Sequence, residues 1–178
     1  PDPLKRFGAY FRPTAVRQEN GGPLFCTQRK VPTMNILISR CLLGVPCRYD
    51  GKSVPVPGLE VALTRAGHTL IPICPEVDGG LPTPRPPAEL QSDGRVVNRE
   101  GKEVTAQYQA GAELAARLAQ AHGCTVAVLK AKSPSCGGRQ VYDGSFSKRL
   151  IPGQGCAARR LAEMGVKLLD ETNWRELG

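Results

Sequence analysis

The sequence has no long apolar run. None of its apolar stretches approaches the roughly 18 to 20 residues that a membrane-spanning helix needs, and the N-terminus lacks the continuous apolar core of a secretory signal peptide. We therefore expect a cytoplasmic protein with no membrane partner. At 178 residues the chain is long enough to bury a sizeable core without disulfide bonds.

Two common site motifs are also missing. The sequence has no C-x-x-C pair, on which most structural zinc sites are built. No G-x-G-x-x-G follows the first predicted strand, where a dinucleotide-binding fingerprint would lie. Cysteine itself is plentiful, at seven residues. In a reducing compartment these are better interpreted as buried residues, metal ligands or catalytic groups than as disulfide halves.

The charge is mildly positive in both parts of the chain. Of the net charge of +8, residues 1–33 carry +4 and residues 34–178 carry the other +4. This balance suits an anionic or polar ligand, although a positive surface also simply aids solubility. No stripe of lysine and arginine with interleaved aromatics is present, so RNA stays open as a partner but is not favoured.

The first 33 residues differ from the rest. They show no helical or alternating apolar period and are rich in turn residues. A buried-strand pattern begins directly after Met34, so we predict that Met34 is the natural start and that residues 1–33 are a poorly ordered extension or an upstream artefact. An ordered arm in an oligomer contact is the alternative. Residues 34–178 are predicted to form a single α/β domain.

Short apolar strands alternate with helical patterns from Met34 onward. This alternation predicts a Rossmann-like, mostly parallel sheet with helices on both faces. Thr105 is a candidate N-cap, and Gly123 a candidate C-cap, of the longest helix. Two hairpin inserts are predicted at residues 95–105 and 139–150. The predicted strands are 35–39, 69–73, 125–130 and 166–169, and the predicted helices are 59–67, 105–123 and 156–165.

Three cysteines follow three of the predicted strands. Cys41 and Cys74 come within two residues of a strand end, and Cys136 lies in the loop after the third strand. The carboxyl ends of parallel strands share one edge of a sheet, where ligands bind, so we expect the three thiols to meet there. Three thiols suit a soft metal centre. Spacing alone leaves three alternatives open: a [4Fe-4S] cluster with one open iron, a zinc ion, or no metal. Cys47 is a candidate fourth ligand.

Polar residues accompany these cysteines. Glu76 follows Cys74 with a proline between them, so a stiff backbone holds a candidate general acid/base at the same edge. Ser133 precedes Cys136, and Arg85 lies in a proline-rich stretch where it either contacts a substrate or closes a loop. Taken singly, Glu76 reads as a surface carboxylate or helix cap and Ser133 as a turn residue. Their attachment to cysteines at strand ends favours a functional reading.

Three segments of the chain resemble the signature segments of the thiouracil desulfidase family. They are "SRCLLGVPCRYDG", "CPEVDGGLPTPRPPAE" and "LKAKSPSCGG", and the similarity extends over about residues 34 to 170. The resemblance implies a [4Fe-4S] cluster held by Cys41, Cys74 and Cys136. Its open iron would take the thiocarbonyl sulfur of a small thiolated nucleobase or nucleoside, water would replace that sulfur, and sulfide would leave without net redox change.

The resemblance also implies roles for two further residues. Glu76 would be the acid/base, and Ser133 would position the substrate or relay a proton. The five matching positions show no departure from the family pattern. Two alternatives stay open: a non-catalytic iron-sulfur or zinc thiolate module, and a Rossmann-like nucleotide-binding protein whose cysteines are structural.

Overall fold

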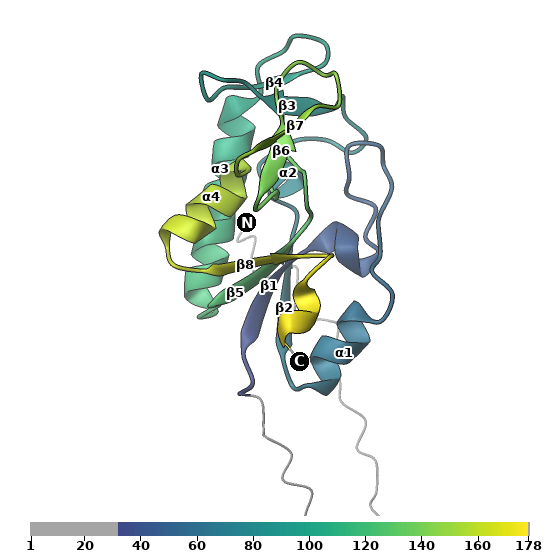
Figure 1. Ribbon diagram of the computed structural model, residues 1–178, viewed down its shortest axis with the longest axis vertical. Coiled ribbons are helices and arrows are strands. Elements are labelled where there is room, and N and C mark those ends of the chain that lie inside the picture. Colours follow the sequence, from purple (N-terminus) through teal and green to yellow (C-terminus); the bar gives the residue numbers. More distant parts are fainter. Residues whose placement is uncertain (1–31, 178) are drawn as a thin grey trace, which may run out of the picture. The chain divides into compact units, whose positions relative to one another are not determined.

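The computed structural model describes residues 32–177 (Figure 1). The predicted extension over residues 1–33 lies almost entirely outside this range and stays a prediction. Among the described residues, no helix combines the length and the apolar character that crossing a membrane requires.

The centre of the fold is a four-stranded parallel sheet in the order β2-β1-β5-β8 (Figure 1). The predicted parallel sheet is therefore confirmed. β1 lies between β2 and β5, so the three strands that precede the cysteine-bearing loops are neighbours. The four strands are β1 (Asn35–Ser39), β2 (Thr69–Ile73), β5 (Val126–Leu129) and β8 (Lys167–Asp170).

Helices cover both faces of the sheet, because successive side chains of a strand point to opposite sides. Leu37 and Ala127 pack against α3 and α4 in one apolar cluster. Ile36 and Val128 point the other way, toward α1 and η3. The predicted helices on both faces are thus confirmed, and Figure 1 shows the two layers. The bounds are α1 (Leu59–Arg65), α3 (Thr105–Ala121), α4 (Cys156–Glu163), η2 (Arg40–Leu43) and η3 (Trp174–Leu177).

Two small antiparallel sheets extend the domain at one end (Figure 1). The predicted hairpin at residues 139–150 is confirmed as β6 (Gln140–Tyr142) paired with β7 (Leu150–Pro152). The predicted hairpin at residues 95–105 is only partly right. Its first arm, β4 (Val96–Asn98), pairs mainly with β3 (Ala88–Leu90), which directly follows the proline-rich stretch. The second arm contributes one bridge, from Glu103 to Val97, because the chain then enters α3.

A four-residue helix, α2 (Pro75–Asp78), was not predicted. It carries Glu76, the candidate acid/base. Pro75 occupies its first position, where the missing N–H costs nothing. α2 lies directly against α3: a methyl group on Gly111 would come within 1.9 Å of the Pro75 carbonyl oxygen. The predicted N-cap of α3 is wrong. Thr105 is the first helical residue, and its hydroxyl instead accepts a hydrogen bond from the Val96 N–H.

The Gly111 contact can be tested by substitution with alanine. Alanine favours a helix over glycine by about 1 kcal/mol, but overpacking costs about 1–3 kcal/mol, and the opposing atom is backbone that cannot rotate away. We expect Gly111→Ala to lower the free energy of unfolding in urea. Gly138→Ala is the matched control, because its new methyl group would meet only ordinary contacts, the nearest at 3.6 Å. Equal stability of the two variants would contradict the close packing of α2 on α3.

Candidate active site

A cavity of about 440 Å³ lies at the carboxyl edge of the parallel sheet. The loops after β1, β2 and β5 form much of its wall, as the strand order requires. All five residues selected from the sequence line this cavity: Cys41, Cys74, Glu76, Ser133 and Cys136. The structure therefore brings together residues that lie up to 95 positions apart in the chain.

Four thiols share this cavity, because Cys47 joins the three predicted cysteines. The Cys47 thiol contacts the thiols of Cys41 and Cys74, and the hydrogen bond with Cys41, followed by burial, raises its pKa to about 11. The hydrogen bond with Cys47 raises the pKa of Cys74 above its usual range, and burial adds to this. Burial raises the pKa of Cys136 to about 12, although the Ser39 hydroxyl, 3.4 Å from its sulfur, acts in the opposite direction. Crowded, buried thiols of this kind become thiolates only beside a cation.

The donor set consists of thiols, the soft ligands that iron-sulfur clusters use. A four-iron cluster binds each thiolate at a separate corner, so its ligands need not converge on one point. Arg40, which precedes Cys41 in the chain, also lines the cavity, and its buried Nε has no hydrogen-bond partner among the described residues. Thiolate or sulfide sulfur is an acceptor that such a donor could use.

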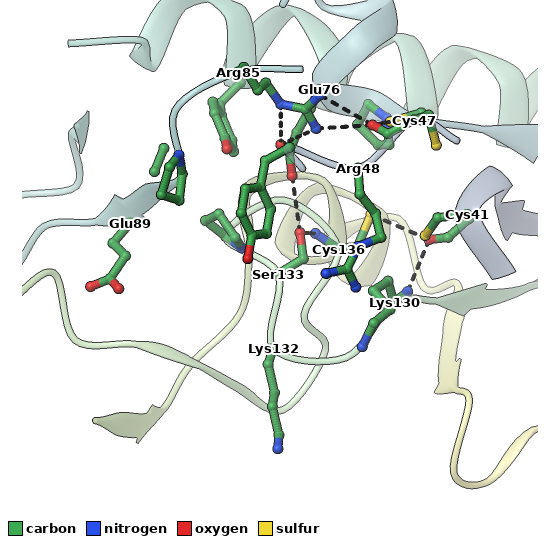
Figure 2. Close-up of a pocket in the computed structure, with 18 of the residues that line it drawn as sticks. Cys41, Cys47, Arg48, Glu76, Arg85, Glu89, Lys130, Lys132, Ser133 and Cys136 are labelled. Atoms are coloured by element: carbon green, nitrogen blue, oxygen red, sulfur yellow. Dashed lines mark hydrogen bonds and ion pairs between the residues drawn. The ribbon is translucent and has the colours of Figure 1, made fainter. Parts of the chain in front are cut away.

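Glu76 is held between two side chains from other segments (Figure 2). Arg85 donates to its Oε2 from Nη2 at 2.6 Å and from Nε at 2.9 Å. The same guanidinium donates to the Cys47 carbonyl oxygen at 3.2 Å. The pair is largely shielded from solvent, with side-chain exposures of 5% for Arg85 and 14% for Glu76. Arg85 thus fastens the proline-rich stretch onto the cavity, which is the loop-closing role that the sequence suggested, and it also lines the cavity.

The hydroxyl of Ser133 has a fixed direction. Its oxygen accepts hydrogen bonds from the backbone N–H groups of Ser135 and Cys136, both at 3.1 Å. With both acceptor positions taken, the hydroxyl proton points to Glu76 Oε1 at 3.3 Å. Ser133 therefore links the cysteine-bearing loop after β5 to the carboxylate on α2.

Comparison with known proteins agrees with this geometry. The sequence profile of the 2-thiouracil desulfurase family matches residues 36–173, which is most of the chain. The chain belongs to this family. It is 32% identical over 151 residues to the uncharacterized protein YbbK of Bacillus subtilis (strain 168), a match that covers 80% of this chain and 99% of YbbK.

A solved structure is also similar to this family member. It is that of the [4Fe-4S]-dependent thiouracil desulfidase TudS, with a TM-score of 0.76 and 44% sequence identity. The match covers 82% of this chain and 95% of the TudS chain. The resemblance stated from three sequence segments is therefore confirmed at the level of family and fold.

Sequence reasoning missed two side chains that adjoin the predicted site of this desulfurase-family protein. Ser39 is the last residue of β1; its hydroxyl donates to the Cys136 sulfur and accepts the Lys130 N–H at 2.9 Å. Its position at the end of a predicted strand could have indicated that it lies at the same edge of the sheet as the cysteines. Tyr108 reaches the cavity from α3, and burial raises its pKa well above the usual value, with the Glu76 carboxylate adding to the effect. No sequence pattern separates Tyr108 from an ordinary core residue of an amphipathic helix.

Cationic side chains outnumber carboxylates on the cavity wall. Four of the seven cations are paired, among them Arg40 with Asp78 and Lys130 with Glu171. Arg99, Lys132 and Lys148 form no ion pair with the described residues. In Figure 2, Lys132 extends away from the Glu76 and Arg85 pair. The excess of positive charge suits the anionic or polar ligand that the sequence composition favoured.

The buried ion pair predicts a large effect of removing one partner. Arg85→Met leaves Glu76 without its counter-charge, and we expect a loss of about 3 kcal/mol in the free energy of unfolding. Replacing Glu76 with glutamine in the same chain should recover part of this loss, because no charge is then left unpaired. Arg95→Met is the control, since its pair with Asp93 is exposed and we expect almost no change. Equal losses in urea unfolding for both arginine variants would refute the buried pair.

Proposed function

We propose that the protein is a [4Fe-4S]-dependent thiouracil desulfidase that converts a thiolated nucleobase or nucleoside to its oxo form and releases sulfide. The proposal rests on one observation above all: cysteines from three neighbouring strand ends share a cavity with a clamped glutamate. Family membership and the name of the similar structure, TudS, support it.

Cys41, Cys74 and Cys136 would hold the cluster as thiolates. When bound there, the cluster supplies an iron with an open position, a soft Lewis acid with affinity for thiocarbonyl sulfur. Cys47 would remain a thiol beside the cluster. The backbone carbonyl of Cys47 is already used, because Arg85 donates to it and so fixes the loop that carries Cys41 and Cys47.

Glu76 would act as the general base for water. Arg85 saturates its Oε2 with two hydrogen bonds, so Oε1 is the oxygen left to take a proton. Ser133 donates to that oxygen in the resting site and would position the water or the substrate. Arg85 would hold the carboxylate in a fixed orientation before the water arrives.

The overall reaction balances without an electron donor or acceptor. Oxygen from water forms a bond to the ring carbon, the carbon–sulfur bond breaks, and sulfur leaves as sulfide with protons that came from water. Glu76 would hold one of these protons between the attack of water and the departure of sulfide. A redox partner is therefore not part of the proposal.

The size of the cavity supports a small substrate. Sites for small molecules commonly measure about 300–1,000 Å³, and the cavity here measures about 440 Å³. We propose a free thiolated base or nucleoside as substrate. Assays of sulfide release with 2-thiouracil, 4-thiouracil and 4-thiouridine would rank these compounds.

The cysteine assignment predicts which substitutions abolish cluster binding. After anaerobic reconstitution, Cys41→Ala, Cys74→Ala and Cys136→Ala should each retain less iron and sulfide per chain and lose the brown cluster absorbance. Cys47→Ala should retain both. Cys124→Ala is the matched control, because Cys124 is also a buried free cysteine but does not line the cavity. Full cluster content in Cys136→Ala, or its loss in Cys47→Ala, would show a different set of ligands.

The base assignment predicts a loss of turnover with the cluster intact. Glu76→Gln keeps the shape of the side chain but removes the base, and kcat should fall by roughly 10² to 10⁴. Iron content and absorbance should match those of the parent protein. Sulfide release at the parent rate would eliminate Glu76 as the base. Zinc in place of iron, with no sulfide release from any thiolated base, would overturn the desulfidase proposal itself.

A further inference from the structure

The loop between β6 and β7, residues 143–149, is held in an unusual backbone conformation over the cavity. Phe146 and Lys148 both have positive φ angles, at 58° and 65°, although neither is glycine. Residues other than glycine, asparagine and aspartate rarely adopt positive φ angles. Such a conformation persists only where surrounding contacts impose it. Phe146, Lys148 and Tyr142 line the cavity. The contacts that impose the conformation therefore also shape the cavity wall.

Glu89 supplies the main contact. Its side chain is buried, with 8% of the residue exposed. Its Oε2 accepts hydrogen bonds from the backbone N–H groups of Gly144 at 3.0 Å and Phe146 at 2.9 Å. A buried carboxylate is tolerated only where such bonds replace water. Glu89 thus joins β3 to the tip of the β6–β7 hairpin, 55 to 57 residues further along the chain.

Two weaker contacts act on the same loop. The side chain of Gln91, which follows β3, donates to the Gly144 carbonyl oxygen at 3.2 Å. The Arg99 guanidinium lies over the Phe146 ring, 5.7 Å from its centre. The ring is therefore held at its backbone by Glu89 and on one face by a cation, and it does not belong to either of the main apolar clusters.

Glu89 does not take part in the Glu76 network. The two carboxylates are the only acidic side chains among the described residues that line the cavity. In Figure 2 Glu89 lies apart from Glu76, Arg85 and Ser133, and no dashed line joins it to them. One carboxylate oxygen of Glu89 is occupied by two backbone groups, which points to a structural task for this side chain.

We propose that Phe146 forms a stacking wall for the planar ring of the substrate and that Glu89 is the positioning residue that holds this wall in place. The ring is taken to be a thiolated pyrimidine, so this part rests on the proposed function. Aromatic side chains bind bases by stacking in a way that tolerates different ring substituents. A wall of this kind would orient the ring while the thiocarbonyl group faces the cysteines.

The positioning role of Glu89 can be measured without catalysis. Trypsin cuts after Lys148 and Arg149, both exposed in this loop, only when the loop opens. In the reconstituted protein, Glu89→Ala should accelerate this cut by about tenfold or more, because two buried charge-assisted hydrogen bonds are lost. Glu89→Gln should restore much of the protection, since its amide oxygen can still accept both N–H groups. Glu100→Ala, on the neighbouring hairpin, is the control and should leave the cut unchanged.

The stacking role is tested with the aromatic ring itself. Phe146→Leu should raise the KM for 2-thiouracil by roughly tenfold with kcat nearly unchanged, because stacking contributes to binding more than to chemistry. Phe146→Tyr keeps the ring and should raise the KM much less than Phe146→Leu does. Cluster content should be the same in all variants. Gln91→Ala serves as a second variant that loosens the loop if Glu89→Ala does not fold.

The outcomes separate this inference from the proposed function. Absence of sulfide release by the parent protein would defeat the desulfidase proposal, whereas the trypsin comparison would still measure the role of Glu89. Equal cleavage of the parent and both loosening variants, Glu89→Ala and Gln91→Ala, would overturn the positioning role. Equal KM values for Phe146→Leu and Phe146→Tyr in an active protein would overturn the stacking wall.

Discussion

Parallel pairing of β1 with both β2 and β5 is the constraint on which the site depends. The registers that join Ser39 to Ile73 and Ile38 to Val128 bring the carboxyl ends of three strands to one edge. The loops that follow have short distances to cover, so cysteines far apart in sequence reach one cavity. The rest of the site is built on this edge: α2 presents Glu76, the proline-rich stretch returns Arg85, and the two small sheets close the far wall.

The site contains a group of thiols and a separate ion pair, Glu76 with Arg85. Contact with other thiols raises the pKa values of Cys47 and Cys74, and burial raises that of Cys136, so without a cation these three thiols add little charge to the interior. The Glu76 carboxylate, which is partly buried near them, has its own counter-charge in Arg85. The counter-charge of Glu76 therefore comes from a residue outside the group of thiols.

The sequence was sufficient to predict the sheet and the meeting of five residues at one cavity, since both follow from strong local signals. Apolar strands bounded by turn residues marked the parallel sheet, and cysteines just beyond them marked its functional edge. Cys47, Tyr108 and Glu89 were harder to interpret because their roles depend on side-chain direction and on partners distant in the chain. β3 escaped prediction for a similar reason: only three residues long, it is defined by its pairing with β4 more than by its own pattern.

The close approach of α2 to α3 bears on attempts to transfer this site to another protein. Glu76 follows Pro75 in α2, and the backbone of Pro75 packs directly on the backbone of Gly111 in α3, with no side chain between them. This contact fixes the position of Glu76. The three cysteine-bearing loops grafted onto a different parallel sheet would lack this support. Transfer of the site to another protein must therefore include α3 with Gly111. The smallest segment that could be transferred is then most of the domain.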